Sequence, residues 1–360
     1  MLELRNVSKM AGGEFHIRPT DLALRRGTLN VLLGPTLSGK TSLMRLMAGL
    51  DKPTEGTIHF DGEDVTGVPV QKRNVAMVYQ QFINYPALTV YENIASPMRI
   101  AGKDRATIDR EVRKAAELLK LTPYLDRTPL NLSGGQQQRT ALARAIVKKA
   151  NLVLLDEPLA NLDYKLREEL REELPKIFAE SGAIFVYATT EPSEALLLGG
   201  NTATLREGRV TQFGPTIEVY RRPVDLLTAK TFADPPLNTI EAVKADGVFR
   251  VGGQAALPVP PHLLGVANGP VTVAFQPHHL ALRRQHDGVA RVSVRTLISE
   301  IAGSESFIHV EFAGARWVML AHGIHDIEPD REIEVYVDAR HLMAFDAEGH
   351  ALGAPAPETA

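Results

Sequence analysis

The stretch from Leu29 to Thr41 joins an apolar run to the spacing Gly-x-x-x-x-Gly-Lys-Thr, whose residue types can bind phosphate groups. Glycines at both ends of the loop allow a tight turn, so that backbone N–H groups point at phosphate oxygens. Lys40 can reach the β- and γ-phosphates, and Thr41 can ligate Mg²⁺. A bare glycine turn would not explain the Lys-Thr pair, so the pattern predicts nucleotide binding. The candidate binding residues are Gly34, Pro35, Thr36, Leu37, Ser38, Gly39, Lys40, Thr41 and Ser42.

A second pattern that can bind an anion is Leu-Ser-Gly-Gly-Gln at residues 132–136, where a helical pattern begins. Its backbone N–H groups would face a phosphate, because the positive end of the helix lies there. By itself the pattern is weak, since many capped helices begin in this way. Two phosphate-binding motifs far apart in one chain are nevertheless hard to explain by a single closed site. The candidate residues are Ser133, Gly134, Gly135 and Gln136.

Two carboxylates end the apolar run 152–155. Asp156 would hold Mg²⁺ through water, and Glu157 would orient or deprotonate the attacking water. Solvated acids at a strand end would be the simpler interpretation of an isolated pair. Because this pair follows a phosphate loop in the same chain, the three motifs together predict hydrolysis of a nucleoside triphosphate.

The elements that must position these residues follow a regular order. Alternating strand and helix patterns up to about residue 220 predict a parallel sheet with helices on its faces. The pattern from Tyr85 to Ala150 is helical, and a charged helix is expected from Asp163 to about Leu174, where Pro175 would break it. After Pro235-Pro236, short alternating strands punctuated by glycine and proline predict a small β-barrel or sandwich.

Composition excludes several classes of protein. The chain has 360 residues, enough for two domains, and 44% of them are apolar, which suffices for a sizeable core. The absence of cysteine excludes disulfides, zinc thiolate sites and thiol catalysis, and a net charge of −3 argues against a nucleic-acid partner. The first residues lack the apolar core of a signal peptide, and no run is long enough to span a membrane. We therefore expect any membrane role to come through partners.

The order of these motifs resembles the nucleotide-binding subunits of ABC transporters. Gln80 lies between the first two motifs, and Leu-Ala-Asn-Leu-Asp at residues 159–163 follows the carboxylate pair. The segments 85–94 and 232–238, together with the β-rich C-terminus, look like the maltose-type importer ATPases for sugars, polyols and glycerol phosphates. The pattern of the whole chain is most similar to one ATPase subunit of glycerol importers that use two different ATPases.

The resemblance implies an α/β fold with a P-loop ABC nucleotide-binding domain at residues 1–235, including a helical subdomain at about 85–150. A small β-rich, OB-like domain for regulation or dimerisation would follow at residues 236–360. ATP and Mg²⁺ would be the cofactors, with ATP held between one subunit's phosphate loop and residues 133–136 of a second ABC ATPase subunit. Further partners would be two integral-membrane permease subunits and a periplasmic solute-binding protein, with no nucleic acid. The chain would be a peripheral subunit at the cytoplasmic face of the inner membrane.

The same resemblance assigns roles to single residues, which we carry over by position in this sequence. Besides the loop residues, the nucleotide-binding set gains Phe15, Ser133–Gln136 and Asp163. The residues assigned to catalysis are Glu157, Lys40, Gln80 and Thr190, and those assigned to the metal are Thr41, Gln80 and Asp156.

One departure from the family pattern concerns catalysis. Thr190 stands at the position of the family's switch histidine, and no histidine occurs between His59 and His262. A threonine hydroxyl cannot offer an imidazole donor to the γ-phosphate, and loss of such a donor can cost on the order of 10²–10³ in rate. The alternative hypothesis is therefore a catalytically weak subunit that pairs with a non-identical second ATPase.

Other departures concern binding and the C-terminal region. Ala11 occupies the position of the adenine-stacking aromatic, for which Phe15 is the candidate substitute, and Leu37 replaces a glycine of relatives, which we expect to be a mild change. Residues 276–280 read Gln-Pro-His-His-Leu, where the family usually carries Arg-Pro-Glu-x-Leu. These histidines lack cysteines and carboxylates at ligand spacing, so we expect surface or strand-end histidines and not a metal site. Trp317 is expected in the core.

Overall fold

The computed structural model describes residues 1–160, 162–252 and 254–353. By its internal contacts the chain divides into two compact units, Met1–Thr216 and Ile217–Ala360. The sequence predicts a boundary after residue 235, whereas the short helices α7 (Thr216–Arg221) and α8 (Leu226–Thr231) lead into the second unit in the structure. Ala229 of α8 is buried in one cluster with Phe345, which explains why this segment belongs to the second unit.

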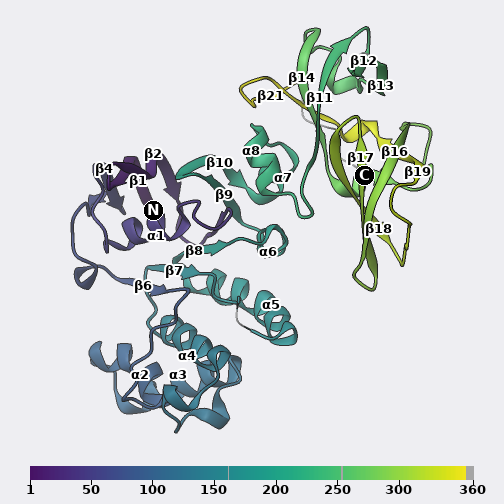
Figure 1. Cartoon of the computed structure of the whole chain (residues 1–360). Helices are drawn as coiled ribbons and strands as arrows, with labels where there is room; N and C mark the ends of the chain where they lie inside the picture. The colour runs from purple at the N-terminus through teal and green to yellow at the C-terminus, as the bar shows by residue number, and fades with distance from the viewer. Residues whose placement is uncertain (161, 253, 354–360) are drawn as a thin grey trace. The chain divides into compact units, whose positions relative to one another are not determined.

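Two sheets form the framework of the first unit (Figure 1). The four-stranded sheet has the order β2-β1-β4-β5, and the six-stranded sheet has the order β10-β9-β3-β8-β7-β6. In the larger sheet only the β9–β10 pair is antiparallel, and the other pairs are parallel as predicted. The strands are β1 (Leu2–Ala11), β2 (Glu14–Leu24), β3 (Leu29–Leu33), β4 (Glu55–Phe60), β5 (Glu63–Asp64), β6 (Val75–Val78), β7 (Leu152–Asp156), β8 (Ile184–Thr189), β9 (Asn201–Arg206) and β10 (Arg209–Pro215).

The helix that follows the phosphate loop, α1 (Lys40–Ala48), packs against both sheets. Its Leu43 and Met44 are fully buried in one core cluster with Leu4 of β1 and Leu154 of β7. All residues of β7 are buried, which is typical of a parallel strand covered on both faces. This packing holds the start of α1 next to the carboxyl ends of the parallel strands.

Three helices form a separate group in the first unit (Figure 1), namely α2 (Val90–Ile100), α3 (Arg105–Leu118) and α4 (Gly134–Val147). They lie within the segment that the sequence predicts to be helical. The helix α6 (Pro192–Leu198) follows β8 directly. The 3₁₀ turns of this unit are η1 (Val70–Lys72), η2 (Thr122–Tyr124) and η3 (Pro129–Asn131).

The prediction that Pro175 ends the charged helix is wrong, because α5 runs over Tyr164–Ser181 with Pro175 inside it. An interior proline removes one backbone hydrogen bond and costs about 3 kcal/mol. Leu170 and Leu174, which precede it, are 1% and 0% exposed. Full burial of such side chains contributes about 1.5–3 kcal/mol each, so the packing of α5 offsets the proline.

The second unit is built from two antiparallel sheets. The first has the order β13-β12-β11-β14-β20-β21 and the second the order β15-β19-β16-β17-β18. Short 3₁₀ turns, η4 (Pro261–Leu263), η5 (Pro277–His279) and η6 (Ala339–His341), connect some of the strands. The strands are β11 (Asn238–Ala245), β12 (Val248–Val251), β13 (Gln254–Pro258), β14 (Gly269–Phe275), β15 (Leu280–Ala281), β16 (Val289–Ile301), β17 (Glu305–Phe312), β18 (Ala315–His322), β19 (Glu332–Asp338), β20 (Met343–Phe345) and β21 (Ala351–Leu352).

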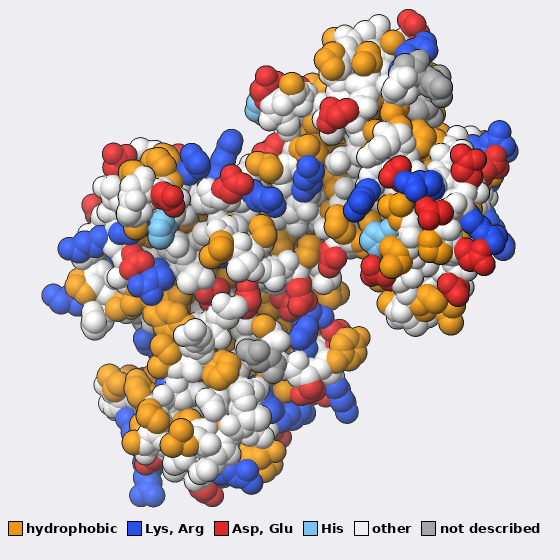
Figure 2. All heavy atoms as spheres, viewed as in Figure 1, with side chains coloured by type: hydrophobic (Ala, Val, Ile, Leu, Met, Phe, Trp, Pro, Cys, Tyr) orange, Lys and Arg blue, Asp and Glu red, His pale blue; other side chains and the backbone are white. Residues whose placement is uncertain are grey.

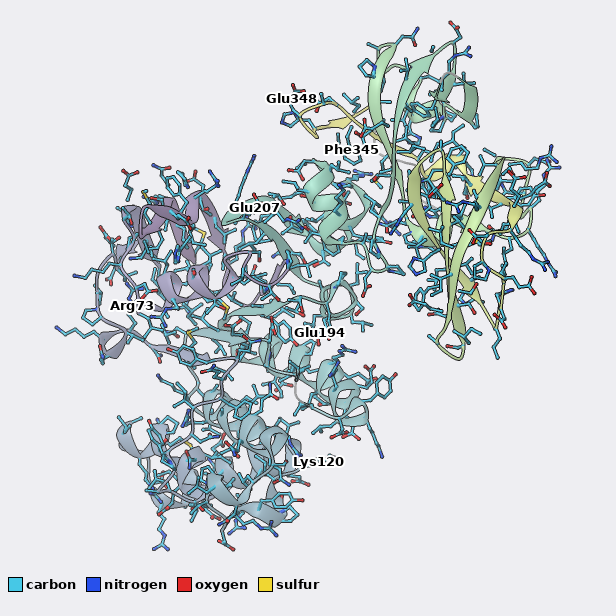
Figure 3. The ribbon with its side chains drawn as sticks, in the orientation of Figure 1. Arg73, Lys120, Glu194, Glu207, Phe345 and Glu348 are labelled. Carbon is cyan, nitrogen blue, oxygen red and sulfur yellow. The ribbon has the colours of Figure 1, made fainter. Side chains whose placement is uncertain are left out.

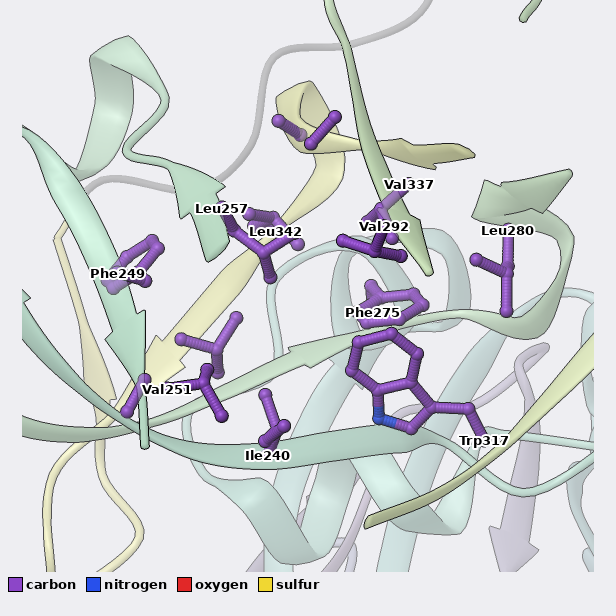
Figure 4. Packing of buried hydrophobic residues seen from close by; sticks show 14 of the residues in the cluster. Ile240, Phe249, Val251, Leu257, Phe275, Leu280, Val292, Trp317, Val337 and Leu342 are labelled. Atoms are coloured by element: carbon purple, nitrogen blue, oxygen red, sulfur yellow. The ribbon is translucent and has the colours of Figure 1, made fainter. Parts of the chain in front are cut away.

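One apolar core joins these two sheets (Figure 4). Trp317 is fully buried there, as predicted, and meets the ring of Phe275 edge-on with centroids 5.0 Å apart. Its indole N–H donates to the carbonyl of Thr239 at 3.1 Å, which satisfies the one polar atom of the side chain. Trp317 is the only tryptophan of the chain, so its fluorescence reports on this unit.

On the face seen in Figure 2, Lys and Arg side chains alternate with Asp and Glu. The small net charge is therefore not gathered into one patch on this face. Within the part of the chain that the structure describes, no helix combines the length and the apolar character needed to cross a membrane.

Three histidine rings of the second unit lie in contact, one pair edge to face and the other pair stacked. The ring centroids of His278 and His279 lie 4.2 Å apart, and the ring of His341 lies parallel to that of His279, also at 4.2 Å. Asp338 and Arg340 stand beside them. Burial lowers the pKa of each of the three histidines, that of His279 to about 3. At His279 charge repulsion from the imidazoles of His278 and His341 lowers the pKa further. Among the described residues no cluster with metal-binding geometry is found.

This stack predicts that the second unit loses stability in mild acid. In the unfolded chain these histidines bind protons near pH 6.5, whereas in the folded chain they bind protons only at lower pH. Lowering the pH below 6.5 therefore favours the unfolded state, and the free energy of unfolding falls. For His279 alone we expect a loss of roughly 1 kcal/mol between pH 7.5 and 5.5. Denaturant unfolding followed by Trp317 fluorescence measures it. The loss should shrink in His279→Phe and persist in the control His322→Gln, and an unchanged loss in His279→Phe would contradict the assignment.

Candidate functional site

The phosphate loop connects β3 to α1 and adopts the shape that its glycines allow. Gly39 has φ of 106°, a left-handed value that favours glycine, and it precedes the first turn of α1 without a side-chain cap. At Gly34 a side chain would not fit, because a Cβ atom would come within 2.4 Å of the carbonyl oxygen of Leu205. The first N–H groups of α1 thus stay available for an anion, as at other helix starts that bind phosphate.

The charged residues predicted for catalysis meet at the end of this loop. The ammonium of Lys40 is hydrogen-bonded to the carbonyls of Gly34 at 2.7 Å and Pro35 at 3.1 Å, and lies 3.9 Å from the carboxylate of Glu157. The hydroxyl of Thr41 donates to Asp156 at 2.7 Å.

Gln80, two residues after the end of β6, completes this group. Its amide N–H donates to the Glu157 carboxylate at 2.9 Å. The backbone carbonyl of Glu157 accepts from the buried amide of Gln138 at 3.2 Å, a contact that the sequence does not reveal. The structure therefore brings Lys40, Thr41, Gln80, Asp156 and Glu157 together, although they are far apart in the chain.

Burial dominates the electrostatics of this group. It lowers the pKa of Lys40, an effect that Glu157 and Asp156 oppose by their negative charges. It raises the pKa of Asp156, against the Thr41 hydrogen bond and the Lys40 charge. It also raises the pKa of Glu157, where the Lys40 charge opposes it and Asp156 reinforces it. A carboxylate with a raised pKa is a better proton acceptor, which suits Glu157 to the role of a general base.

The sheet order explains why these groups converge. β8 lies between β3 and β7, so the phosphate loop, Thr190 and the Asp156-Glu157 pair all follow the carboxyl ends of neighbouring parallel strands. Ligands of α/β proteins bind at this edge. Glu157 itself has φ of 46°, a left-handed conformation that a side chain adopts at a cost and that is common at functional sites.

A cavity of about 770 Å³ lies in front of this group. It is lined by residues 36–42 of the loop and by Gln80 and Glu157, together with the segment 13–16, Arg18, Glu207 and Gly208. Phe15 is 43% exposed, and the Arg18 guanidinium lies over its ring at 5.7 Å. Phe15 and the buried Ile17 are two residues apart on β2, so their side chains lie on the same face of the strand. This period-two signal places Phe15 in the cavity, whereas the lining contributed by His16 and Arg18 was not predicted.

Other predicted residues lie outside the lining of this cavity. Thr190 is exposed at the end of β8 and, among the described residues, does not line the cavity. Ser133 and Gln136 form a capping box at the start of α4, in which the Ser133 N–H donates to the Gln136 side chain at 2.9 Å. Asp163 caps α5 by accepting from the Leu166 N–H at 3.0 Å. Asn161, which belongs to the motif 159–163, lies outside the described residues.

Leu37 adopts a strained position in the loop. Its φ is 67°, in the left-handed region that costs a non-glycine residue about 1–2 kcal/mol, and its side chain is 96% exposed. The change from the glycine of relatives, which we expect to be mild from the sequence, therefore carries a backbone cost.

Comparison with known proteins places this geometry in a family. A family model described as ABC transporter matches residues 17–160. An sn-glycerol-3-phosphate import ATP-binding protein of Cupriavidus pinatubonensis is 34% identical, over 96% of this chain and 97% of that protein. A trehalose/maltose import ATP-binding protein of Thermococcus litoralis is 35% identical, over 96% of this chain and 97% of that protein. An alpha-glucoside transport ATP-binding protein of Rhizobium meliloti is 36% identical, over 98% of this chain and 99% of that protein.

A solved structure agrees with the fold. The ATP-binding cassette MJ0796 bound to ADP and Pi aligns with a TM-score of 0.55 and 28% identity, covering 60% of this chain and 99% of that chain. The phosphate loop on β3 and the carboxylates on β7 thus define an ATP-binding cassette. The chain belongs to the ATP-binding subunits of ABC importers.

Proposed function

We propose that this chain hydrolyses ATP with Mg²⁺ to power the import of a sugar, polyol or glycerol-phosphate solute. The observation that carries the proposal is that Lys40, Thr41, Gln80 and Glu157 line one cavity, with the buried Asp156 hydrogen-bonded to Thr41. The sugar and glycerol-phosphate members of this solute class follow from the names of the relatives, which are sn-glycerol-3-phosphate import, trehalose/maltose import and alpha-glucoside transport ATP-binding proteins. Phosphate release from MgATP by the purified chain, above the rate of a Glu157 variant, is the test.

The donor set fits Mg²⁺. The Thr41 hydroxyl and the Asp156 carboxylate are hard oxygen ligands 2.7 Å apart, and the Gln80 amide offers a third oxygen. Mg²⁺ is usually held by one or two carboxylates together with substrate phosphates, so few protein ligands suffice. When bound, the ion would neutralise charge on the β- and γ-phosphates.

The remaining residues divide the work of hydrolysis. Glu157 accepts the proton of the attacking water, and Gln80 holds its carboxylate in place through the amide contact. Lys40 leaves the loop carbonyls to contact the β- and γ-phosphates. The ring of Phe15 is the surface on which the adenine stacks, in place of the missing aromatic at Ala11.

The partners follow from the family. A second ATPase cassette would supply its own Ser133–Gln136 segment to this chain's phosphate loop, and Asp163 would lie at the same interface. Two permease subunits in the membrane and a solute-binding protein outside it would complete the importer. The chain would then be peripheral at the cytoplasmic face of the membrane, with the domain at about 236–360 serving regulation or dimerisation.

The second cassette can be a copy of this chain or a different ATPase. The relatives give no support to a non-identical partner. Thr190 is the single observation that favours a non-identical partner. A site that hydrolyses ATP slowly can be tolerated when the second site of the dimer hydrolyses it fast.

Replacing Thr190 by histidine separates these two possibilities. If the missing imidazole limits the rate, Thr190→His is expected to raise the steady-state ATPase rate by roughly 10- to 100-fold, with a smaller effect on the KM for ATP. Thr190→Ala is the control and should stay near the wild type. A wild-type rate well above that of Glu157→Gln, unchanged by the histidine, would contradict the weak site and remove the motive for a non-identical partner.

A further inference from the structure

A buried polar network lies directly behind the turn that carries Thr190. At its centre is Glu194 of α6, labelled in Figure 3, which is 5% exposed. Its carboxylate accepts from the Thr189 hydroxyl at 2.6 Å, from the Tyr187 hydroxyl at 3.1 Å and from Arg171 of α5 at 3.2 Å. A buried carboxylate with three donors is fully satisfied, so the network fixes the end of β8.

The turn after β8 is held by the same network. The Thr189 hydroxyl accepts from the backbone N–H of Glu191 at 3.0 Å. The Glu191 carboxylate accepts from Arg171 at 3.0 Å and from Arg167 at 3.4 Å. Two arginines of α5 thus bind Glu191 on one side of Thr190, and Arg171 is also connected to Thr189 on the other side through Glu194.

Arg167 also holds a second segment. Its other terminal nitrogen donates to the carbonyls of Ala160 and Leu162, at 3.3 and 3.4 Å. Ala160 lies three residues after Glu157 in the chain, and its backbone N–H donates to the Glu157 carbonyl at 3.3 Å. The guanidinium of Arg167 therefore joins the segment that leaves Glu157 to the turn that carries Thr190. Only a planar fork with several N–H groups can make both contacts at once.

The contacts of Arg167 and Arg171 with the other described residues leave one buried hydrogen-bond donor of each side chain unsatisfied. The Nε atoms of Arg167 and Arg171 are buried without a hydrogen-bond partner among the described residues. An unsatisfied buried donor costs about 1–3 kcal/mol, and each such group in a folded protein asks for an explanation. Glu157, at the other end of the segment, sits at φ of 46°, so its carboxylate direction depends on how the following residues are held.

We propose that Arg167 and Arg171 are positioning residues for ATP hydrolysis, which hold Glu157 and the turn at Thr190 in register through Glu191 and Glu194. The inference rests on the ATPase function proposed above. It predicts that the arginines set the rate of the hydrolytic step and leave the affinity for ATP unchanged, because neither lines the nucleotide cavity.

Steady-state kinetics of the full-length chain with MgATP test this inference. Arg167→Met should lower kcat about tenfold, because a misplaced catalytic group slows the chemical step. KM and the Kd of a fluorescent ATP analogue should stay within about twofold of the wild type. Arg167→Lys keeps the positive charge that pairs with Glu191 but loses the planar guanidinium, so its kcat should lie between those of the wild type and Arg167→Met. Arg113→Met, which breaks an exposed ion pair with Asp109 in the helical group, is the matched control and should leave both quantities unchanged.

A second variant keeps the test decisive if Arg167→Met folds poorly. Glu191 is 43% exposed at its side chain, so Glu191→Gln should fold normally and lower kcat in the same way. Because both changes break the Arg167–Glu191 contact, the loss of kcat in the double variant should be smaller than the product of the two single losses. Additive losses, an unchanged kcat or a matching loss of ATP affinity would overturn the inference. A wild-type rate no higher than that of Glu157→Gln would instead overturn the ATPase function, and the inference with it.

Discussion

Replacing Glu157 by glutamine is expected to lower the steady-state ATPase rate by about 10²–10⁴-fold, which is the range for loss of a general base. Glutamine keeps the size of the side chain but cannot accept a proton from water. Its oxygen can still accept from the Gln80 amide, so the cavity should keep its shape. Nucleotide affinity should therefore change little, and phosphate release together with binding of a fluorescent ATP analogue measures both effects.

The control for this variant is Glu173→Gln, which makes the same chemical change at an ion pair on the surface of α5. It should leave the ATPase rate unaltered. A Glu157→Gln variant that retains more than about a tenth of the wild-type rate would mean that another group takes the proton, since general bases are worth far more.

Mixing two inactive variants is expected to restore part of the activity. Lys40→Ala removes the ammonium proposed to contact the phosphates, and Gly134→Asp places a negative charge where the γ-phosphate of a second subunit's ATP is proposed to lie. Each should lower the ATPase rate at least about 10²-fold. Gly134 tolerates the new side chain, because an added Cβ atom would lie 3.7 Å from Phe82, and an acid stabilises the start of a helix.

In a mixed dimer one site has both an intact phosphate loop and an intact 133–136 segment. Random exchange of subunits in a symmetric dimer should therefore give about a quarter of the wild-type rate. Lys40→Ala alone, at the same total protein concentration, is the control. If mixed dimers form and no activity returns, the 133–136 segment does not complete the site of a second copy. Activity of this chain only with a different ATPase would then support a non-identical pair.

Much of the first unit could be predicted because its signals are local. The phosphate loop, the capping box at Ser133 and the Asp156-Glu157 pair are each contained in a few consecutive residues, and the structure places them at the ends of strands and helices as expected. The helical segment after Tyr85 is likewise visible as a repeating apolar face. The same holds for the alternating strands around Val310 in the second unit.

Contacts between distant segments could not be predicted in this way. The Gln80–Glu157 hydrogen bond and the stacking of His279 on His341 depend on tertiary packing that no local pattern encodes. The continuation of α5 through Pro175 is a further case, in which packing overrides a local preference. The left-handed backbone of Glu157 has no sequence signal at all, since glutamate rarely adopts it.

The turn after β8 also has a consequence for how such a protein can change over evolutionary time. Thr189 and Glu191 are both tied into the network around Glu194, whereas Thr190 between them is exposed. If histidine at position 190 raises the ATPase rate as proposed, that substitution should change the rate of ATP use and leave folding almost untouched. The position proposed to tune ATP consumption is thus separate from the residues that hold the turn, so over evolutionary time one could change without destabilising the other.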